Sequence, residues 1–380
     1  MAEPIKKIRS PIRQQHAEQY LLITLLSFAA SVSFTRLFLE LTGYPQLGGG
    51  ELHIAHVLWG GLLLFIAALL PLLFTNRWIY TLVSALAGVG VGLFIDEVGK
   101  FITQTNDYFY PAAAPIVYVF FMLTVLVYVL IQKEKPDNPR DNLYYIFQDL
   151  EEVLDHDLSP LEQAAIRARL KKVIAVDAHP DLTWLAKCLV DFLERDALYL
   201  SPEKPSLLQR GLQRWRQFEE RFLSRTRLRA FLAGGLLAWG IWAISYPLRV
   251  WGSLRTPAAF EAVMTRLISE NYVRGTLGLN LFRVRIGLEG SVGLLLLFAA
   301  FLLATGRDRW AVMLSYAGLL ITLTIVNPLL FYFEQFSTIF NASIQTALLL
   351  GTLYYRHRYL DRPRKQVEPS DPPSTLETAS

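Results

Sequence analysis

Long apolar stretches separated by shorter polar connections dominate this sequence. A bilayer core about 30 Å thick needs roughly 20 residues of apolar helix to cross it, and eight stretches reach or approach that length. They lie at about 20–41, 54–74, 78–98, 113–132, 230–250, 286–304, 311–331 and 337–355. The pattern predicts an all-α integral membrane protein with about eight transmembrane helices.

One long polar segment interrupts these stretches. Residues 133–229 separate the first four apolar stretches from the last four, so we expect two four-helix membrane halves, 20–132 and 230–355. The segment before them, 1–19, is basic. The segment after them, 356–380, is basic at first and then rich in proline, serine and acidic residues, which predicts a disordered tail.

Helical patterns run through the 133–229 insert. Ser159, Pro160 and Glu162 have the spacing of a capping box with proline at the first helical position. The expected apolar face of that helix is Leu161, Ala165, Leu170 and Ile174. In 206–229, arginines alternate with apolar residues, as in a helix lying on an anionic leaflet or in a solvated bundle helix.

The lysines and arginines of the short connections indicate the orientation. With the N-terminus inside, twelve of them lie in the inside connections and six in the outside ones. Basic residues favour the cytoplasmic side, so we expect both termini and the insert to be cytoplasmic. Five of the six outside residues fall in one loop after the fifth apolar stretch, where Pro257 is expected to begin a surface helix over 257–270.

Composition narrows the chemistry further. Apolar residues make up 53% of the 380 positions, and the formal charge is only +4. The basic clusters flank apolar stretches, so their expected partners are anionic lipid headgroups and not nucleic acid. A single cysteine, Cys188, excludes internal disulfides and multi-thiolate metal sites.

Ionisable residues of the first half gather at the ends of the first three helices, on the predicted outer face. They are Arg36, Glu40, Glu51, His53, His56, Asp96, Glu97 and Lys100. Such groups are costly in hydrocarbon and usually face a protein interior or water. If this protein has a catalytic or binding region, we expect it here, in a polar pocket open to the outside.

Four interpretations of this group remain open. It could be a structural hydrogen-bond and ion-pair network that holds the three helices together. His53, His56 and Glu97 could hold a divalent metal such as zinc, which would allow a hydrolase acting on a lipid or another extracytoplasmic substrate, with Glu97 or Glu51 as general base. A proton- or ion-coupled transporter would use His56 and Asp96 as titrating groups.

Helical geometry restricts the pairs within this group. Neighbouring positions on a helix differ by about 100°, so at most one of Asp96 and Glu97 is expected to reach the histidines. Spacings of four residues predict the pairs Arg36 with Glu40 and Asp96 with Lys100.

Glycines predict close helix packing at the same level. Gly60 follows His56 by one turn, and Gly88, Gly90 and Gly92 alternate along the third apolar stretch. Gly88 and Gly92 share a helical face, as in small-xxx-small packing motifs. The glycines lie inside an apolar span and do not follow a strand, which excludes a dinucleotide-binding loop.

The two halves share short stretches. Gly61–Leu70 matches Gly293–Leu302, and Leu93–Glu97 matches Leu330–Glu334. A parallel duplication of four helices would explain them, and so would chance similarity between apolar segments of low complexity.

Three motifs carry a resemblance to a known family. The sequences RLFLELTGYP from Arg36, ELHIAHVLWGG from Glu51 and GVGLFIDEVGKF from Gly90 resemble stretches of a family of uncharacterised bacterial multi-pass inner-membrane proteins. The likeness covers residues 30 to about 118, a quarter of the chain. It implies a location in the bacterial plasma membrane and no particular activity.

Overall fold

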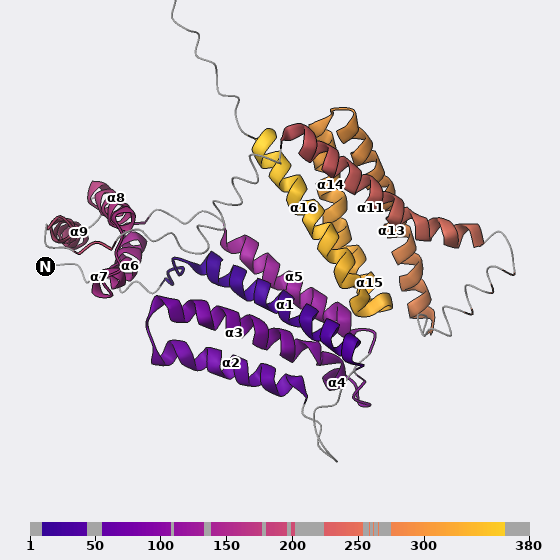
Figure 1. The fold of residues 1–380 in the computed structure, drawn as a ribbon, viewed down its shortest axis with the longest axis horizontal. Helices are drawn as coiled ribbons and strands as arrows, with labels where there is room; N and C mark the ends of the chain where they lie inside the picture. The colour runs from indigo at the N-terminus through magenta and orange to yellow at the C-terminus, as the bar shows by residue number, and fades with distance from the viewer. Residues whose placement is uncertain are drawn as a thin grey trace, which may run out of the picture. The chain divides into compact units, whose positions relative to one another are not determined.

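Every regular element in the described part of this computed structural model is helical (Figure 1). The structure describes residues 10–43, 55–107, 110–132, 138–176, 180–195, 199–201, 224–253 and 275–361, with the single positions 258, 261 and 265. The chain forms two compact units, Met1–Arg214 and Trp215–Ser380. The expected all-α fold is confirmed for these residues.

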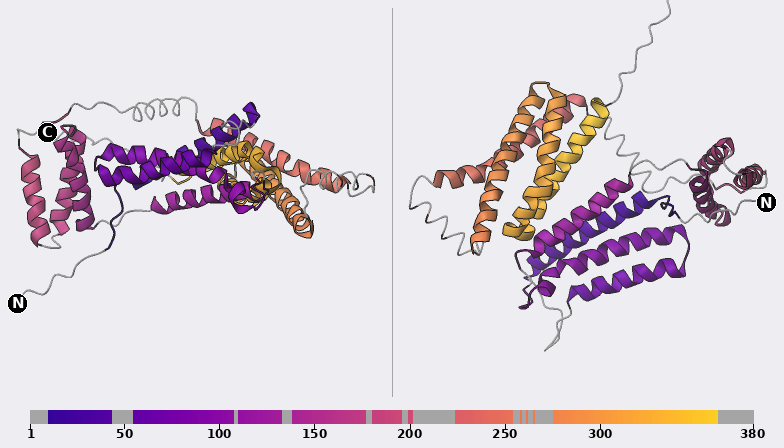
Figure 2. Two further views of the ribbon diagram at one scale, coloured as in Figure 1. Left: turned by 90° about the horizontal axis from the view of Figure 1, so that it is seen from below. Right: turned by 180° about the vertical axis from the view of Figure 1, so that it is seen from behind.

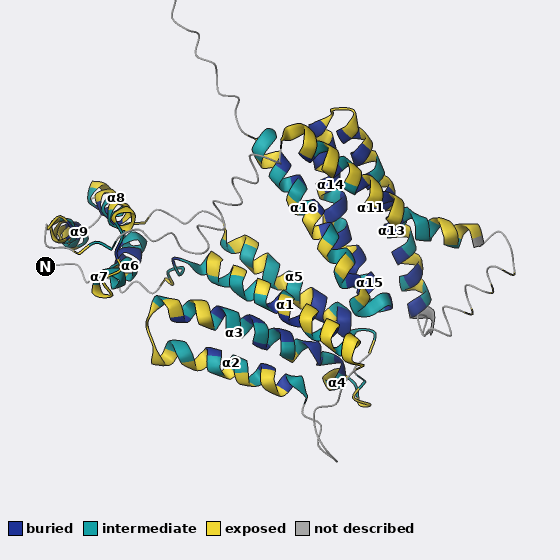
Figure 3. Ribbon diagram, viewed as in Figure 1, coloured by how far each residue is buried: buried dark blue, intermediate teal, exposed yellow. Residues whose placement is uncertain are grey.

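Seven helical stretches among the described residues are long and apolar enough to cross a membrane. Four lie in the first unit and three in the second. Large apolar side chains such as Phe34, Trp59 and Leu72 are exposed on them, and exposed positions recur along the spanning helices (Figure 3). Apolar surface of this extent fits contact with lipid.

The candidate membrane-spanning helices of the first unit are α1 (Ala17–Thr42), α2 (His56–Leu73), α3 (Arg77–Asp96) and α5 (Ala113–Ile131). The short helix α4 (Val98–Ile102) follows α3. Helix α3 packs between α1 and α2, and α5 packs against α1, so the neighbours follow the order α2, α3, α1, α5 (Figures 1 and 2).

Glycines allow α3 to contact helices on both of its sides. A Cβ atom at Gly88 would overlap the carbonyl oxygen of Thr24 on α1, and one at Gly92 would lie 2.7 Å from Ser31. On the other side, a Cβ at Gly90 would lie 3.0 Å from the carbonyl oxygen of Gly60 on α2. The alternating glycines therefore serve two interfaces, and the predicted close packing is confirmed.

Four helices form the described part of the insert: α6 (Pro139–Asp149), α7 (Glu151–Leu154), α8 (Pro160–Val176) and α9 (Pro180–Leu193). The capping box is confirmed, because the Ser159 N–H donates to Glu162 Oε2 at 3.0 Å and the Glu162 N–H to Ser159 Oγ at 3.3 Å.

The predicted apolar face of α8 is wrong in its first turns. Leu161 and Ala165 are exposed. The buried residues that contact α6 and α9 are instead Ile166, Leu170 and Val173. The two faces share Leu170, and Ile174 packs against the same cluster, so the error is confined to the first half of the helix, where Ile166 and not Ala165 supplies the buried apolar side chain.

The second unit contains α11 (Arg225–Ser253), α13 (Gly275–Ala304), α14 (Asp308–Ile321), the π-helix η1 (Thr322–Val326), α15 (Asn327–Glu334), the 3₁₀-helix η2 (Gln335–Thr338) and α16 (Ile339–Tyr359). Helix α13 packs between α11 and α14, α16 packs against α14, and α11 also contacts α16.

The chain reverses direction between α15 and α16. Gln335 has a left-handed φ of 51°, and the hydroxyl of Tyr355, near the end of α16, donates to Oδ2 of Asp308 at the start of α14 at 2.7 Å. The stretch Asp308–Tyr359 therefore runs along the unit and returns.

Two sequence expectations change in this unit. Arg283 and Arg285, expected in a loop, lie on α13, which begins well before residue 286. The helix tolerates Arg285 because its side chain is paired with acidic side chains, whereas Arg283 is exposed. The helix neighbours also differ between the units, since the second spanning helix of the first unit packs at the edge while α13 packs centrally. This argues against a duplication that preserves the arrangement.

Several expectations concern residues outside the described part. These are the site candidates Glu51 and His53, the basic helix over 206–222, most of the surface helix over 257–270 and the tail beyond residue 361. They stay predictions.

Candidate functional site

Five residues at one end of α1, α2 and α3 form what we call the α1–α3 polar cluster: Arg36, His56, Asp96, Glu97 and Lys100. Asp96 is the last residue of α3 and is fully buried. Arg36 Nε on α1 donates to its Oδ1 at 2.6 Å, and Arg36 NH2 donates to its main-chain oxygen at 3.0 Å. The second bond satisfies a carbonyl that the end of α3 leaves without a helical partner.

Glu97 occupies the junction between α3 and α4. Its backbone (φ −90°, ψ 9°) leaves the helical path, and its buried carboxylate accepts a hydrogen bond from the Val57 N–H at 3.1 Å through Oε2. Val57 lies in the first turn of α2, where N–H groups lack helical acceptors and favour negative charge. Glu97 therefore caps α2 from another part of the fold, and Lys100 pairs with its other oxygen.

His56 begins α2 and contacts both carboxylates. Its Nε2 lies 3.2 Å from Asp96 Oδ2, and its Nδ1 lies 3.9 Å from Glu97 Oε1. The expectation that only one of the two acids reaches the histidines is therefore wrong for His56, because α3 ends at Asp96 and Glu97 does not continue its helical path.

The pairing within the cluster is mostly between helices. Arg36 binds Asp96 on α3, while its predicted partner Glu40 is exposed on α1. Lys100 binds Glu97 at a spacing of three residues. Two cations thus face two carboxylates, and all four carboxylate oxygens have a partner. This arrangement is balanced in charge and links three helices.

The cluster offers few free ligands for a metal. Among the described residues, no group of three histidine, cysteine, aspartate or glutamate side chains could hold a metal ion. The proposed zinc set included His53, which lies outside the described residues, so that set stays a prediction. The Glu97 oxygens that it would use are already bound to Lys100 and Val57.

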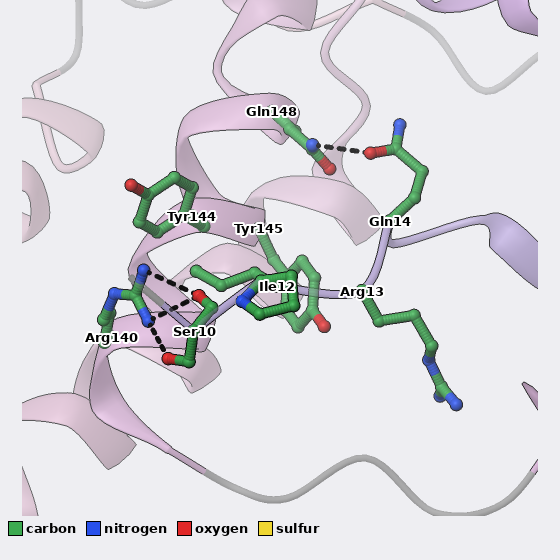
Figure 4. A pocket seen from close by; sticks show the side chains of 9 residues that line it. Ser10, Ile12, Arg13, Gln14, Arg140, Tyr144, Tyr145 and Gln148 are labelled. Atoms are coloured by element: carbon green, nitrogen blue, oxygen red, sulfur yellow. Dashed lines mark hydrogen bonds between the residues drawn. The ribbon is translucent and has the colours of Figure 1, made fainter. Parts of the chain in front are cut away.

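A cavity of about 290 Å³ lies in the first unit between the N-terminal segment and α6 (Figure 4). It is lined by Ser10, Pro11, Ile12, Arg13, Gln14, Arg140, Tyr144, Tyr145 and Gln148. Arg140 donates to Ser10 Oγ at 2.9 Å, and Arg13 extends away from the tyrosines and donates to the main-chain oxygen of Ile131. Both arginines are thus used to hold the N-terminal segment against the insert and the end of α5.

Acidic residues of the insert meet α3 near this cavity. Arg77, at the start of α3, pairs with Glu152 and contacts His16. Burial, together with the nearby Glu162, raises the pKa of Glu152 to about 7 despite the Arg77 charge. Burial also raises the pKa of Asp149, although Arg169 and Gln15 bind its carboxylate. For Glu162, the hydrogen bonds from Ser159 outweigh the effect of burial and lower the pKa.

The second unit holds polar groups that the sequence analysis missed. Asn327 Nδ2 donates to Gln345 Oε1 at 2.7 Å, and both side chains are buried. Arg285 on α13 pairs with Glu289 and Glu334. The four-residue spacing of Arg285 and Glu289 was a signal for this pairing, but an apolar-stretch criterion assigned Arg285 to a loop.

No protein-family model matches this sequence, and no curated protein or solved structure matches it either. The resemblance to bacterial inner-membrane proteins therefore stays a prediction.

Proposed function

We propose that this chain is a multi-pass protein of the bacterial plasma membrane that crosses the bilayer eight times, in two sets of four helices separated by the insert. Asp308–Tyr359 contains 52 residues, which would extend about 78 Å as one straight helix at 1.5 Å per residue. A bilayer core is about 30 Å thick. The reversal at Gln335 supports two crossings here.

Both termini and the insert are cytoplasmic in this proposal. The N-terminal segment, the start of α3 and the insert contact one another through Arg140 with Ser10 and Arg77 with Glu152, which supports a common side for all three. The excess of basic residues in the same connections supports the cytoplasmic side. The basic residues there would contact anionic lipid headgroups.

The α1–α3 polar cluster, at the extracytoplasmic end in this topology, acts as a network that holds three helices in register. The observation that carries this role is the complete pairing of Asp96 and Glu97, whose four oxygens bind Arg36, His56, Lys100 and the Val57 N–H. A metal-dependent hydrolase would need one of these carboxylates to leave its partners and bind a metal or a water.

A proton- or ion-coupled transporter is the second candidate. Buried ionisable groups within membrane spans are typical of ion and proton pathways, and both units contain them. In the second unit, the π-helix η1 directly precedes the buried Asn327, and π-helical turns occur frequently at functional sites.

The single native cysteine allows a direct test of the topology. Cys188 is exposed on α9 of the insert, so a membrane-impermeant maleimide should label it only after the plasma membrane of intact spheroplasts is permeabilised. Cys188→Ser is the control for specific labelling. Equal labelling before and after permeabilisation would overturn the cytoplasmic insert and, with it, the extracytoplasmic position of the cluster.

A further inference from the structure

Arg285, Glu289 and Glu334 form a buried charged group in the second unit, which we call the Arg285 triad. The side chains of Arg285 and Glu289 on α13 are 4% and 6% exposed, and that of Glu334 at the end of α15 is 30% exposed. Arg285 Nε lies 3.4 Å from Glu289 Oε2, and Arg285 NH2 donates to Glu334 Oε1.

The charges of the triad do not balance. One guanidinium faces two carboxylates, and its other contacts are the aromatic rings of Tyr246 and Phe333, at 5.3 and 5.5 Å. Arg249 also lies over Tyr246 but is exposed and forms no ion pair with either glutamate. An uncompensated charge is costly in such surroundings and is usually removed by protonation.

Glu289 is the member of the triad with the weaker partners. Its Oε2 is buried and accepts no hydrogen bond from the described residues, and its contact with Arg285 Nε is longer than a good charge-assisted hydrogen bond. Glu334 takes the closer bond from Arg285 and is partly exposed. The excess negative charge is therefore best removed at Glu289, while Glu334 forms the open side of the triad.

We propose that Glu289 is a proton-binding site and that its proton exchanges with water through Glu334. In the loaded state, the proton is bonded to a carboxyl oxygen of Glu289, and Arg285 and Glu334 form an ion pair. On release, the proton passes to the Glu334 carboxylate and from there to water, and Arg285 stays charged and then faces two carboxylates. This site goes beyond the network role proposed above and does not depend on it.

The surroundings favour a proton over a metal cation. Hard cations such as Ca²⁺ and Mg²⁺ need six or more oxygen ligands, whereas the triad supplies two carboxylates, and its guanidinium lies over the rings of Tyr246 and Phe333. Tyr246 and Arg249 on α11 and Tyr332 on α15 lie in the same region of the unit, and α13 itself also carries Arg283, which is exposed. None of these supplies a second basic partner for Glu289.

Infrared spectroscopy of the full-length protein in lipid nanodiscs tests the proposal. A protonated carboxyl group in an apolar site has a C=O stretching band separate from that of carboxylates, and we expect this band at near-neutral pH. Glu289→Gln should remove it and the exposed-site control Glu40→Gln should not. Glu334→Gln leaves Arg285 facing a single carboxylate, so the band should persist only at lower pH, and its shift on transfer to D₂O should there be slower than in the wild type. An unchanged band in Glu289→Gln would overturn the proposal.

A second measurement uses the unmodified protein, in case the variants do not fold. An apolar carbodiimide reacts with protonated carboxyl groups in apolar surroundings, so mass spectrometry should find the adduct on Glu289 at near-neutral pH and lose it at alkaline pH. Protection by Na⁺ at constant pH would identify a metal-cation site and overturn the proton assignment. Absence of any adduct on Glu289 would overturn the site itself.

Discussion

Arg36 on α1 binds Asp96 on α3 twice, through the side-chain oxygen Oδ1 at 2.6 Å and through the main-chain oxygen at 3.0 Å. One arginine thus neutralises a buried carboxylate and caps the helix that carries it. The two residues are 60 positions apart, so this contact fixes the relation of α1 to α3 and not only the local conformation.

A double-mutant cycle on this pair tests the network role. Arg36→Gln and Asp96→Asn should each lower the free energy of unfolding by about 3–5 kcal/mol, because each leaves a buried charge without its partner. The double variant should lose clearly less than the sum of the two. Thermal unfolding in detergent measures the effect, with the exposed Glu40→Gln as control. Additive losses would contradict the network.

Adjacent glycines on α2 provide a matched test of helix packing. A Cβ at Gly60 would lie 2.7 Å from the Phe94 nitrogen and 2.8 Å from the Gly90 oxygen, whereas one at Gly61 meets nothing within 4 Å. Gly60→Ala should destabilise the protein by about 1–3 kcal/mol, since the backbones must separate. Gly61→Ala should be neutral or stabilise it by up to about 1 kcal/mol through helix propensity. Equal melting temperatures of the two variants would refute the close α2–α3 contact.

Metal analysis separates the network from a zinc site. The purified protein should contain no stoichiometric zinc, because the Glu97 oxygens are bound to Lys100 and to the Val57 N–H. Mass-spectrometric metal analysis of the wild type and of a His53→Ala/His56→Ala variant measures this. One equivalent of zinc in the wild type that is lost in the variant would establish the metal site instead.

The sequence was sufficient for the features that depend on local or periodic patterns. Apolar stretches predicted the spanning helices, Ser159 and Glu162 predicted a helix start, and Gly88 and Gly92 predicted a packing face. The ionisable residues of the first unit were also expected to meet, because their positions at helix ends place Arg36, His56 and Asp96 at one level of the membrane.

Features that depend on tertiary contacts were not predictable in the same way. Glu97 reaches His56 only because α3 ends one residue earlier, and no periodic pattern marks that break. Arg285 was assigned to a loop because a hydropathy pattern places charged residues outside apolar helices and does not include ion pairs. In the fold, pairing with Glu289 and Glu334 offsets the free-energy cost of burying this charge within the helix. The contact of Arg77 with Glu152 joins segments that the sequence separates by 75 residues.

The burial of Glu152 predicts that stability depends on pH, even though Arg77 pairs with this carboxylate. The pKa of Glu152 is raised from 4.5 to about 7 in the folded protein, so the folded state keeps a proton that the unfolded chain releases. The resulting stabilisation is complete below pH 4.5, falls as the pH rises, and is lost above about pH 7. The pKa of Asp149 is also raised, so its contribution to stability also falls as the pH rises. The pKa of Glu162 is lowered, so its contribution to stability has the opposite sign and changes only below about pH 4.5.

Glu152→Gln should therefore flatten the decline in melting temperature between pH 5 and about pH 7.5, since the variant has no carboxyl group at this position to ionise. At neutral pH, we expect Glu152→Gln to raise the free energy of unfolding by on the order of 1 kcal/mol. One pKa unit corresponds to about 1.4 kcal/mol, and solvent screening of the partly exposed pair with Arg77 reduces the full effect of the shift. Asp155→Asn, an exposed position one turn further along the chain, is the control. The prediction would be contradicted if the wild-type melting temperature rose between pH 5 and about pH 7.5, or if it changed with pH equally in the wild type and in Glu152→Gln. Either result would show that Glu152 is ionised throughout this range because the Arg77 charge outweighs burial.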